Sequence, residues 1–145
     1  MQMSIPFVNH VGIEEKDDKT LKLAFKENVQ NHIGTMHGAA QFALAETQSG
    51  FYLESIFPEY KGKIIPLLRS SSVKYKNPAT TEVYGVATAS AESLEKFEVQ
   101  FLKKGRATIT VFVELRDTNN VVTMLGEFGW FIQKDEQKKD YINLQ

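Results

Sequence analysis

Cysteine is absent from the 145-residue sequence, and this absence excludes disulfide bonds, thiolate zinc sites and thiol nucleophiles together. Any nucleophile of the chain is therefore oxygen-based. Neither sign of charge predominates either, because 17 Lys and Arg residues stand against 18 Asp and Glu residues. A chain without a strong field of one sign does not attract polyanions, so we expect neither nucleic acid nor a membrane surface as a partner.

Long hydrophobic runs are also missing. No segment reaches the ~18 uninterrupted apolar residues that a membrane helix needs, and residues 1–10 lack the basic and apolar regions of a secretory signal. We therefore expect a cytoplasmic protein. Its 42% hydrophobic and 24% charged residues are ordinary for a globular chain. A chain of this length buries about 70% of its surface in one core, which predicts a single domain over residues 1–145, with a charged tail over about residues 134–145.

Hydrophobic periodicity predicts one long helix. From about His37 to Phe57 the apolar residues fit a helical period, and Pro58 ends the pattern. The first two turns are apolar on almost every side, with Gln41 as the polar exception. Such a helix has to be covered on most sides, so we expect it at the centre of the fold.

The remaining periodic segments predict strands. They cover residues 21–25, 64–76, 81–90, 107–115 and 121–133. The segment over residues 94–102 fits either a helix or a strand by its period, and its high Glu and Lys content favours a helix.

This order of elements predicts an α+β fold in which an antiparallel sheet of about five strands wraps around one long central helix. Such a sheet leaves its edges and one apolar face incompletely covered. A symmetric homodimer is the simplest way to cover them. Whether two dimers join back to back as a dimer of dimers stays open.

The candidate functional residue is Glu46, a carboxylate halfway along the predicted helix. Burial there would raise its pKa and make it a better general base. The structural alternative is that Glu46 lies on a solvated stripe with Gln48 and Glu54. Periodicity alone does not separate these two interpretations.

A loop over residues 31–38 runs directly into this helix. Backbone amides in the first turn of a helix lack intrahelical partners, and together with the helix dipole they can hold an oxyanion. Gly38 has no side chain to block a ligand oxygen at that place. Glu46 follows eight residues later, about 12 Å along the helix axis, so we expect no direct contact between the two residues within one chain.

These residues resemble the fingerprint of the hot-dog fold thioesterases of the phenylacetate-pathway type and of a related, less characterised bacterial branch. The fingerprint consists of an asparagine, a Gly-Thr-x-His-Gly turn and an acidic residue eight positions after the last glycine. It falls here on Asn31, Gly34, Thr35, His37, Gly38 and Glu46. The resemblance covers most of the chain.

The resemblance implies an acyl-CoA thioesterase that works as a homodimer. The amide of Gly38 would polarise the thioester carbonyl, and Asn31 would position a water molecule. Glu46 would reach across from the other subunit and either activate this water or attack the carbonyl itself. Coenzyme A is then part of the substrate, and no separate cofactor is expected. Three further residues of the turn would contact the substrate, namely Met36, His37 and Ala39.

The sequence departs from the family pattern at three positions. Ala39 replaces the second glycine of the turn, and Glu46 replaces the commoner aspartate. A hydroxyl residue that the family supplies from the next strand falls near Leu68, where this chain offers none, although Ser70 and Ser71 lie close. We therefore expect these two serines to contact the substrate.

Basic residues flank Gly105 at the start of a predicted strand. The family often uses such residues for the nucleotide phosphates, which makes Lys104 and Arg106 candidates for that role. The structural alternative is a solvated, lysine-rich helix end that interacts favourably with the helix dipole.

The histidines do not suggest a metal centre. His32, His37 and Glu46 lack a third nitrogen ligand at the spacing of zinc hydrolases, so we expect no metal. Instead, His37 is expected to fix the loop through a backbone hydrogen bond. A nucleophile elbow, a Walker loop and a dinucleotide fingerprint are all absent from the sequence.

Two other functions remain open on the sequence. His32 and Glu46 stand fourteen residues apart, as do the histidine and glutamate of the 3-hydroxyacyl thioester dehydratases of the same fold, but the proline-rich loop of that family is missing. The second alternative is a domain that binds acyl-CoA or another lipid without turnover, which Ala39 and Leu68 support.

Overall fold

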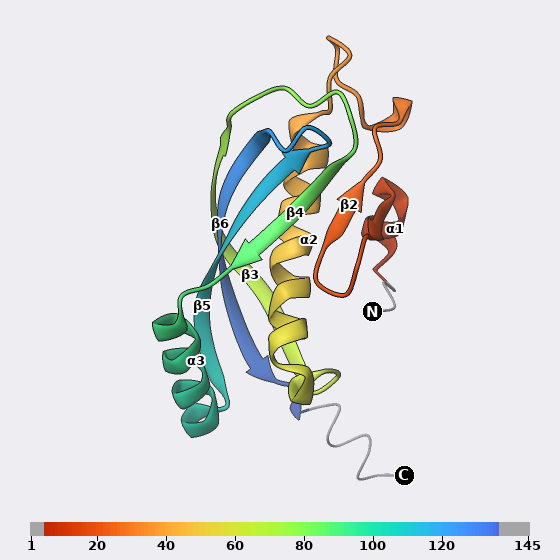
Figure 1. The fold of residues 1–145 in the computed structure, drawn as a ribbon. Coiled ribbons are helices and arrows are strands. Elements are labelled where there is room, and N and C mark those ends of the chain that lie inside the picture. The colour runs from red at the N-terminus through yellow and green to blue at the C-terminus, as the bar shows by residue number, and fades with distance from the viewer. Residues whose placement is uncertain (1–4, 137–145) are drawn as a thin grey trace.

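The computed structural model describes residues 5–136, and this part of the chain contains three α-helices, two 3-10 helices and six strands (Figure 1). The helices are α1 (Pro6–Val11), η1 (Glu27–Val29), α2 (Gly38–Ile56), η2 (Pro58–Tyr60) and α3 (Ala91–Lys104). The strands are β1 (Ile13–Glu15), β2 (Leu21–Leu23), β3 (Ile64–Tyr75), β4 (Val83–Thr88), β5 (Arg106–Asp117) and β6 (Val122–Lys134).

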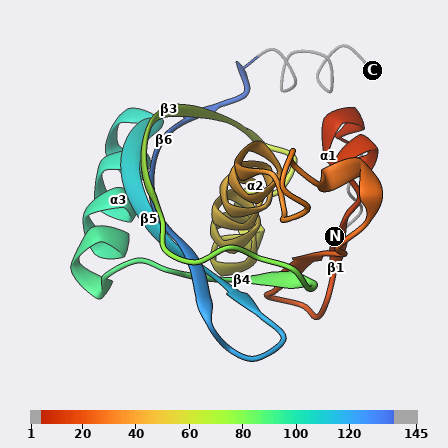
Figure 2. The same cartoon turned by 90° about the horizontal axis from the view of Figure 1, so that it is seen from above.

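All six strands belong to one sheet in the order β1-β2-β4-β5-β6-β3, and every neighbouring pair is antiparallel. The sheet curls around α2, which lies at its centre (Figures 1 and 2). The predicted α+β class, with an antiparallel sheet wrapped around one long helix, is therefore confirmed.

The sheet has six strands rather than about five because β1 precedes the first predicted strand. The helix α1, which comes before β1, was not predicted either. These two elements span only six and three residues, too few to show a hydrophobic period. Tertiary contacts hold them instead, since Val8 and Ile13 are both buried in the core. The first predicted strand is also shorter than expected, because β2 ends at Leu23 and Phe25 lies outside it.

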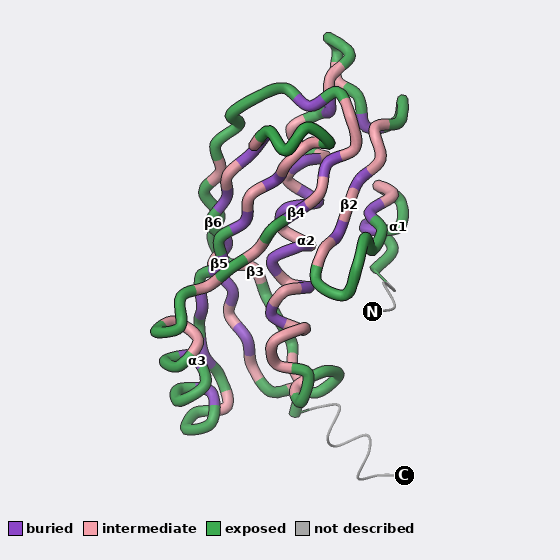
Figure 3. Tube along the Cα trace, viewed as in Figure 1, coloured by how far each residue is buried: buried purple, intermediate pink, exposed green. Residues whose placement is uncertain are grey.

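The core lies between α2 and the concave face of the sheet, where the buried segments gather (Figure 3). Along β5 buried and exposed residues alternate, and the buried set is Ala107, Ile109, Val111, Val113 and Leu115. Four large aromatic residues, Phe42, Phe51, Phe128 and Trp130, pack in or against this core.

The ambiguous segment before β5 is helical. The hydroxyl oxygen of Ser90 caps the start of α3 by accepting a hydrogen bond from the Ser93 N–H, and Gly105 ends the helix with a positive φ of 72°. The apolar face of α3 carries Phe97 and Phe101, whose rings stack at 5.6 Å between centroids. Phe97 also packs on Phe57 just after α2, so α3 closes the core at this end.

Gln48 joins α2 to β2 inside the core. Its side chain is fully buried. Its Oε1 accepts the Leu21 N–H at 2.7 Å, and its Nε2 donates to the Lys19 carbonyl at 2.9 Å. Gly85 leaves room for it, because a Cβ there would lie 2.6 Å from Gln48 Cγ. The alternative in which Glu46 shares a solvated stripe with Gln48 is therefore wrong.

Strand β3 forms one edge of the sheet. It runs for twelve residues and pairs only with β6, and most of its residues are exposed. Seen along α2, the helix is enclosed by the sheet except on the side between β3 and α1 (Figure 2). A long edge strand next to an open side of the central helix is a surface on which another chain can pair.

Replacing Gln48 by Leu keeps the volume of the side chain but leaves the Leu21 N–H and the Lys19 carbonyl without their partner. We expect Gln48→Leu to lower the free energy of unfolding by about 2–3 kcal/mol, measured by urea denaturation. The matched control is Ser55→Ala on the same helix, whose hydroxyl bonds only to the Tyr52 carbonyl one turn earlier. Equal effects of the two substitutions would contradict this assignment.

Candidate active site

The loop before α2 is organised by Asn31. Its Oδ1 accepts the N–H groups of Ile33 and Thr35, each at 3.0 Å, and its Nδ2 donates to Thr35 Oγ1 at 2.8 Å. Of the polar groups in the Asn31 side chain, only the second hydrogen of Nδ2 has no partner within residues 5–136. Asn31 therefore holds the turn, and one N–H of its amide remains for a water molecule or a ligand.

His37 caps the N-terminus of α2. Its Nδ1 accepts the Ala39 N–H at 2.9 Å, and its carbonyl accepts the N–H groups of Ala40 and Gln41 at 3.0 and 3.1 Å. The Gly38 N–H has no partner within residues 5–136. Of the amides in this first turn, Gly38 is thus the one that can polarise a carbonyl oxygen.

The cap also fixes the state of the imidazole. Because Nδ1 accepts a hydrogen bond, the neutral ring of His37 carries its proton on Nε2. The residue is exposed, so this second N–H is free to meet solvent or a ligand. The expected backbone hydrogen bond of His37 is confirmed.

Tyr75, at the end of β3, lies directly against Gly38. Its hydroxyl donates to the Gly38 carbonyl at 3.0 Å. A Cβ on residue 38 would lie 3.2 Å from the tyrosine ring, so any larger residue at this position would require the ring to move slightly away from the helix. Sequence reasoning missed this contact, because 37 residues separate the two positions and no local pattern connects them.

Glu46 lies on the side of α2 that faces β6 and the edge strand β3. One turn earlier, the Phe42 ring meets that of Phe128 at 5.7 Å between centroids. One turn later, a Cβ on Gly50 would lie 3.4 Å from Trp130. Residues four apart share one face of a helix, so Glu46 leaves the helix between these two aromatic contacts.

The carboxylate of Glu46 is half-buried and has no hydrogen bond or ion pair within residues 5–136. Burial removes water from the charged form and raises the pKa of Glu46. Glu54, two turns further along the helix, differs because it pairs with Lys61 at 3.6 Å. An unpaired carboxylate with a raised pKa has the character of a general base.

A β-bulge decides which serine of β3 faces this side of α2. The pairing of β3 with β6 shifts between Leu68 and Ser70. Beyond the shift, Ser71 pairs with Phe128, whose ring contacts α2. Ser71 therefore lies on the same face of the sheet as α2, whereas Ser70 pairs with Gly129 and faces the opposite side.

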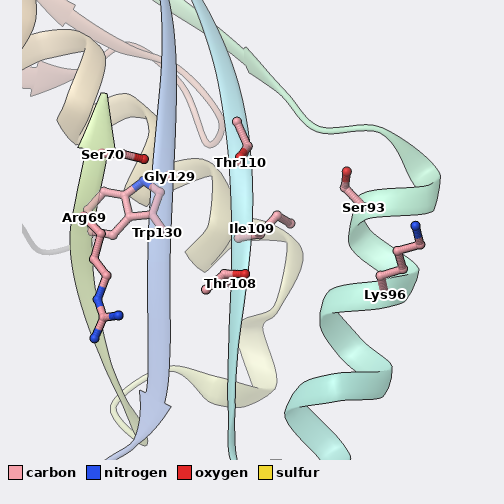
Figure 4. Close-up of a pocket in the computed structure, with 9 residues that line it drawn as sticks. All are labelled: Arg69, Ser70, Ser93, Lys96, Thr108, Ile109, Thr110, Gly129 and Trp130. Carbon is pink, nitrogen blue, oxygen red and sulfur yellow. The ribbon is translucent and has the colours of Figure 1, made fainter. Parts of the chain in front are cut away.

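Ser70 lines a separate groove of about 390 Å³ on the outer face of the sheet. Figure 4 shows it beside Gly129, with Thr108 and Thr110 on β5 and Lys96 on α3 further across. The structure thus separates the two serines that the sequence grouped together. Leu68, at the position where a hydroxyl was looked for, packs against the core.

Two other residues of the predicted turn differ in exposure. Met36 is only 2% exposed and belongs to the core, whereas Ala39 is exposed at the start of α2. Of the two, only Ala39 presents its side chain to a ligand in this arrangement.

The predicted phosphate-binding residues, Lys104 and Arg106, lie at the opposite end of the sheet from Gly38. Arg106 lies at the same height as Ile65, because both residues pair with the same position of β6. Gly38 lies against Tyr75. Ile65 and Tyr75 are ten residues apart on β3, about 33 Å along the strand. One protomer therefore does not bring these groups together.

Within residues 5–136, no three His, Asp or Glu side chains gather in a way that could hold a metal ion. His32, which the dehydratase alternative pairs with Glu46, is exposed in the loop before α2. No helix in the described part of the chain has the length and apolar character needed to cross a membrane.

Several solved structures share this architecture at low sequence identity. A Pseudomonas aeruginosa protein of unknown function, called a probable thioesterase, has a TM-score of 0.77 and 21% identity, over 91% of this chain and 89% of its own. A Bacillus halodurans protein with CoA has a TM-score of 0.68 and 17% identity, over 87% and 74%. The phenylacetic acid degradation protein of Thermus thermophilus, as a mutant, has a TM-score of 0.66 and 17% identity, over 88% and 98%.

These similarities confirm the hot-dog fold that the sequence predicts. A search of curated proteins finds no match to the chain. Residues 2–132 match the profile of DUF4442, a family described as a domain of unknown function. Since this match spans most of the sequence, the chain belongs to the DUF4442 family.

Proposed function

We propose that this protein hydrolyses acyl-CoA thioesters at a site built from two copies of the chain. The observation that carries the proposal is the unpaired, half-buried carboxylate of Glu46 on the same helix as the free N–H of Gly38. A base and an oxyanion donor are the two groups that acyl transfer to water requires.

The chemistry follows from these two groups. The thioester oxygen accepts the Gly38 N–H, which stabilises the negative charge that develops during attack. In one route, Glu46 of the other subunit takes a proton from water as the water oxygen bonds to the carbonyl carbon, and the C–S bond then breaks. In the other route, the Glu46 carboxylate attacks that carbon, the C–S bond breaks, and water hydrolyses the resulting anhydride. Both routes release a carboxylic acid and, once the thiolate takes up a proton, free coenzyme A. The Asn31 amide has one N–H left with which to hold the water.

The comparisons support the class of reaction. Thioesterases are among the proteins with this fold, and one protein with this fold was crystallised with CoA. The match of this chain to the pattern of Asn31, Gly38 and Glu46 adds the residues that would act. These two observations support acyl-CoA as the substrate class.

A homodimer through β3 would bring the two groups together. Gly38 and Glu46 are about 12 Å apart along one helix, so they do not meet within a protomer. Gly38 lies at the height of Tyr75, and Glu46, between the contacts of α2 with Phe128 and Trp130, lies near the height of Ser70. If two β3 strands pair antiparallel about an axis near Ser72, each Gly38 comes to the height of the other subunit's Glu46.

The same symmetry would supply the basic residues. Lys104 and Arg106 lie about 33 Å from Gly38 along the sheet of one protomer. Antiparallel pairing reverses the direction of the partner's β3. The end of the partner's sheet that carries Arg106 therefore comes close to the end of the first protomer's sheet that carries Gly38. The phosphates of a CoA bound at Gly38 would then lie on the side of the partner's basic end.

The activity is tested with a panel of acyl-CoAs and a thiol-detecting reagent. We expect Glu46→Gln to lower kcat by about 10²–10⁴-fold, the usual contribution of a general base. The matched control is Glu54→Gln on the same helix, which should keep kcat within about twofold because Glu54 pairs with Lys61.

The pH profile provides a second readout. Because only the ionised carboxylate acts, kcat/KM should rise with pH through an apparent pKa above the ordinary glutamate value of about 4.3. Tight binding of acyl-CoA without turnover in the parent protein would instead support the non-catalytic alternative. Hydration of crotonyl-CoA that depends on Glu46 would support the dehydratase.

Glu46 should also cost the protein stability at neutral pH. Since burial raises its pKa, the folded chain binds the proton more tightly than the unfolded chain, and stability falls as pH rises through the glutamate range. We expect Glu46→Gln to have a higher Tm than the parent at pH 7, with the difference vanishing below about pH 4. A lower Tm of this variant at pH 7 would show that the carboxylate has a stabilising partner.

The dimer is tested by introducing a single cysteine. Because the sequence contains no other cysteine, any disulfide bond must form between two copies of the introduced residue. On an antiparallel two-fold axis, the two copies of one residue have Cα atoms about 4.5–5.5 Å apart, within the range of a disulfide bond. We expect Ser72→Cys to form a covalent dimer under mild oxidation. Val99→Cys on the exposed face of α3, where Val99 is 62% exposed, should not. A monomer in sedimentation and no cross-link would refute this dimer.

A further inference from the structure

A second hollow lies beside the start of α2. It measures about 380 Å³ and is formed between α1 and α2, with the loop around Val29 as its third wall. Helix α1 contributes Phe7, His10 and Val11, and α2 contributes Ala39 and Ala40. The size falls in the lower part of the range of small-ligand sites.

The lining of this α1–α2 groove contains no Lys, Arg, Asp or Glu. Besides its apolar residues, it includes the amide side chains of Asn28 and Gln30 and two histidines. The phosphates of coenzyme A bind most strongly to Arg and Lys side chains, and these walls contain neither. The groove therefore suits an uncharged, apolar chain and not the nucleotide end of coenzyme A.

Phe7 is the largest apolar residue that lines this groove. It is 62% exposed, although Val8 on the same helix is buried in the core. The position of α1 is fixed by Val8 and by the turn at Gly12, whose φ is 94°. A phenyl ring held in solvent by a helix anchored in the core is available to a ligand without rearrangement.

The groove begins at the candidate active site. His37 and Ala39, which line it, are the two sequence neighbours of Gly38, whose N–H is free. A thioester whose carbonyl oxygen meets that N–H would send one of its two substituents into the groove. The acyl chain is the apolar one, whereas the pantetheine arm carries two amides and leads to charged phosphates.

We propose that the groove between α1 and α2 binds the acyl chain of the substrate and that Phe7 sets which chain lengths fit. This specificity role rests on the proposed thioesterase function, but binding of the chain itself does not. The short helix α1, which has no part in the proposed chemistry, would thus determine which acyl chains bind.

Binding is measured without turnover by calorimetry with S-octyl-CoA, a thioether that cannot be hydrolysed, against CoA alone. The parent protein should bind S-octyl-CoA more than about tenfold more tightly than CoA, because burial of methylene groups favours binding. Phe7→Ser should reduce this ratio to about two or less while leaving the affinity for CoA unchanged. Ala40→Phe, which fills the groove from the side of α2, should have the same effect.

The matched control is Phe112→Ser. Phe112 is also an exposed phenylalanine, at 45% exposure, but it lies on the outer face of β5 away from the groove. It should leave the ratio unchanged. Circular dichroism and Tm values near those of the parent would show that each variant is folded.

The outcomes separate the two proposals. If Phe7→Ser weakens CoA and S-octyl-CoA equally, the groove holds the pantetheine arm and the acyl proposal is overturned. If hydrolysis depends on Glu46 but the ratio and the preferred acyl length ignore Phe7, the acyl proposal fails and the proposed function stands. If no acyl-CoA is hydrolysed but the ratio depends on Phe7 and Ala40, the proposed function fails and the acyl groove stands.

Discussion

The fold depends on the need to cover a nineteen-residue helix that is apolar on most of its surface. Burial of apolar area is the main favourable term in folding, and one curled sheet provides it for α2. The sheet does not close, so α2 is left open between β3 and α1 (Figure 2). The open side of the helix carries the candidate chemistry, and the site therefore lies where the fold is least complete.

The rigidity of α2 sets a second constraint. A single helix carries both the free amide of Gly38 and the carboxylate of Glu46, so their separation cannot change within a protomer. A site that needs both groups has to take them from two chains. In the proposed dimer, the surface that hides the edge of the sheet is then also the surface that assembles the reacting groups.

Much of this arrangement could be predicted from the sequence, because strong periodic patterns reflect local burial. The long helix, the strand with alternating burial over residues 107–115 and the helix α3 all follow from their period or composition. The half-burial of Glu46 was one of two interpretations that the sequence left open, and the contacts of α2 with the sheet decide between them.

The features that sequence reasoning missed depend on contacts between distant segments. Gln48 reads as a polar surface residue, yet it is buried because two backbone groups before and in β2 need a partner. The contact of Tyr75 with Gly38 joins positions that share no local pattern. The short elements α1 and β1 are held by contacts with the core rather than by helix or strand propensity. They are too short to show a hydrophobic period in the sequence.

The bulge in β3 has a consequence for how this chain can vary in evolution. One extra residue, Arg69, lies between Leu68 and Ser70, where the pairing with β6 shifts. Loss of the extra residue, Arg69, would leave Leu68 opposite Trp130 and Ser70 opposite Gly129, so Tyr75 would keep its partner on β6 and its face. Loss of one residue between Ser71 and Tyr75 would instead turn Tyr75 away from α2. Related genes should therefore tolerate a deletion at position 69 but not one further along the strand.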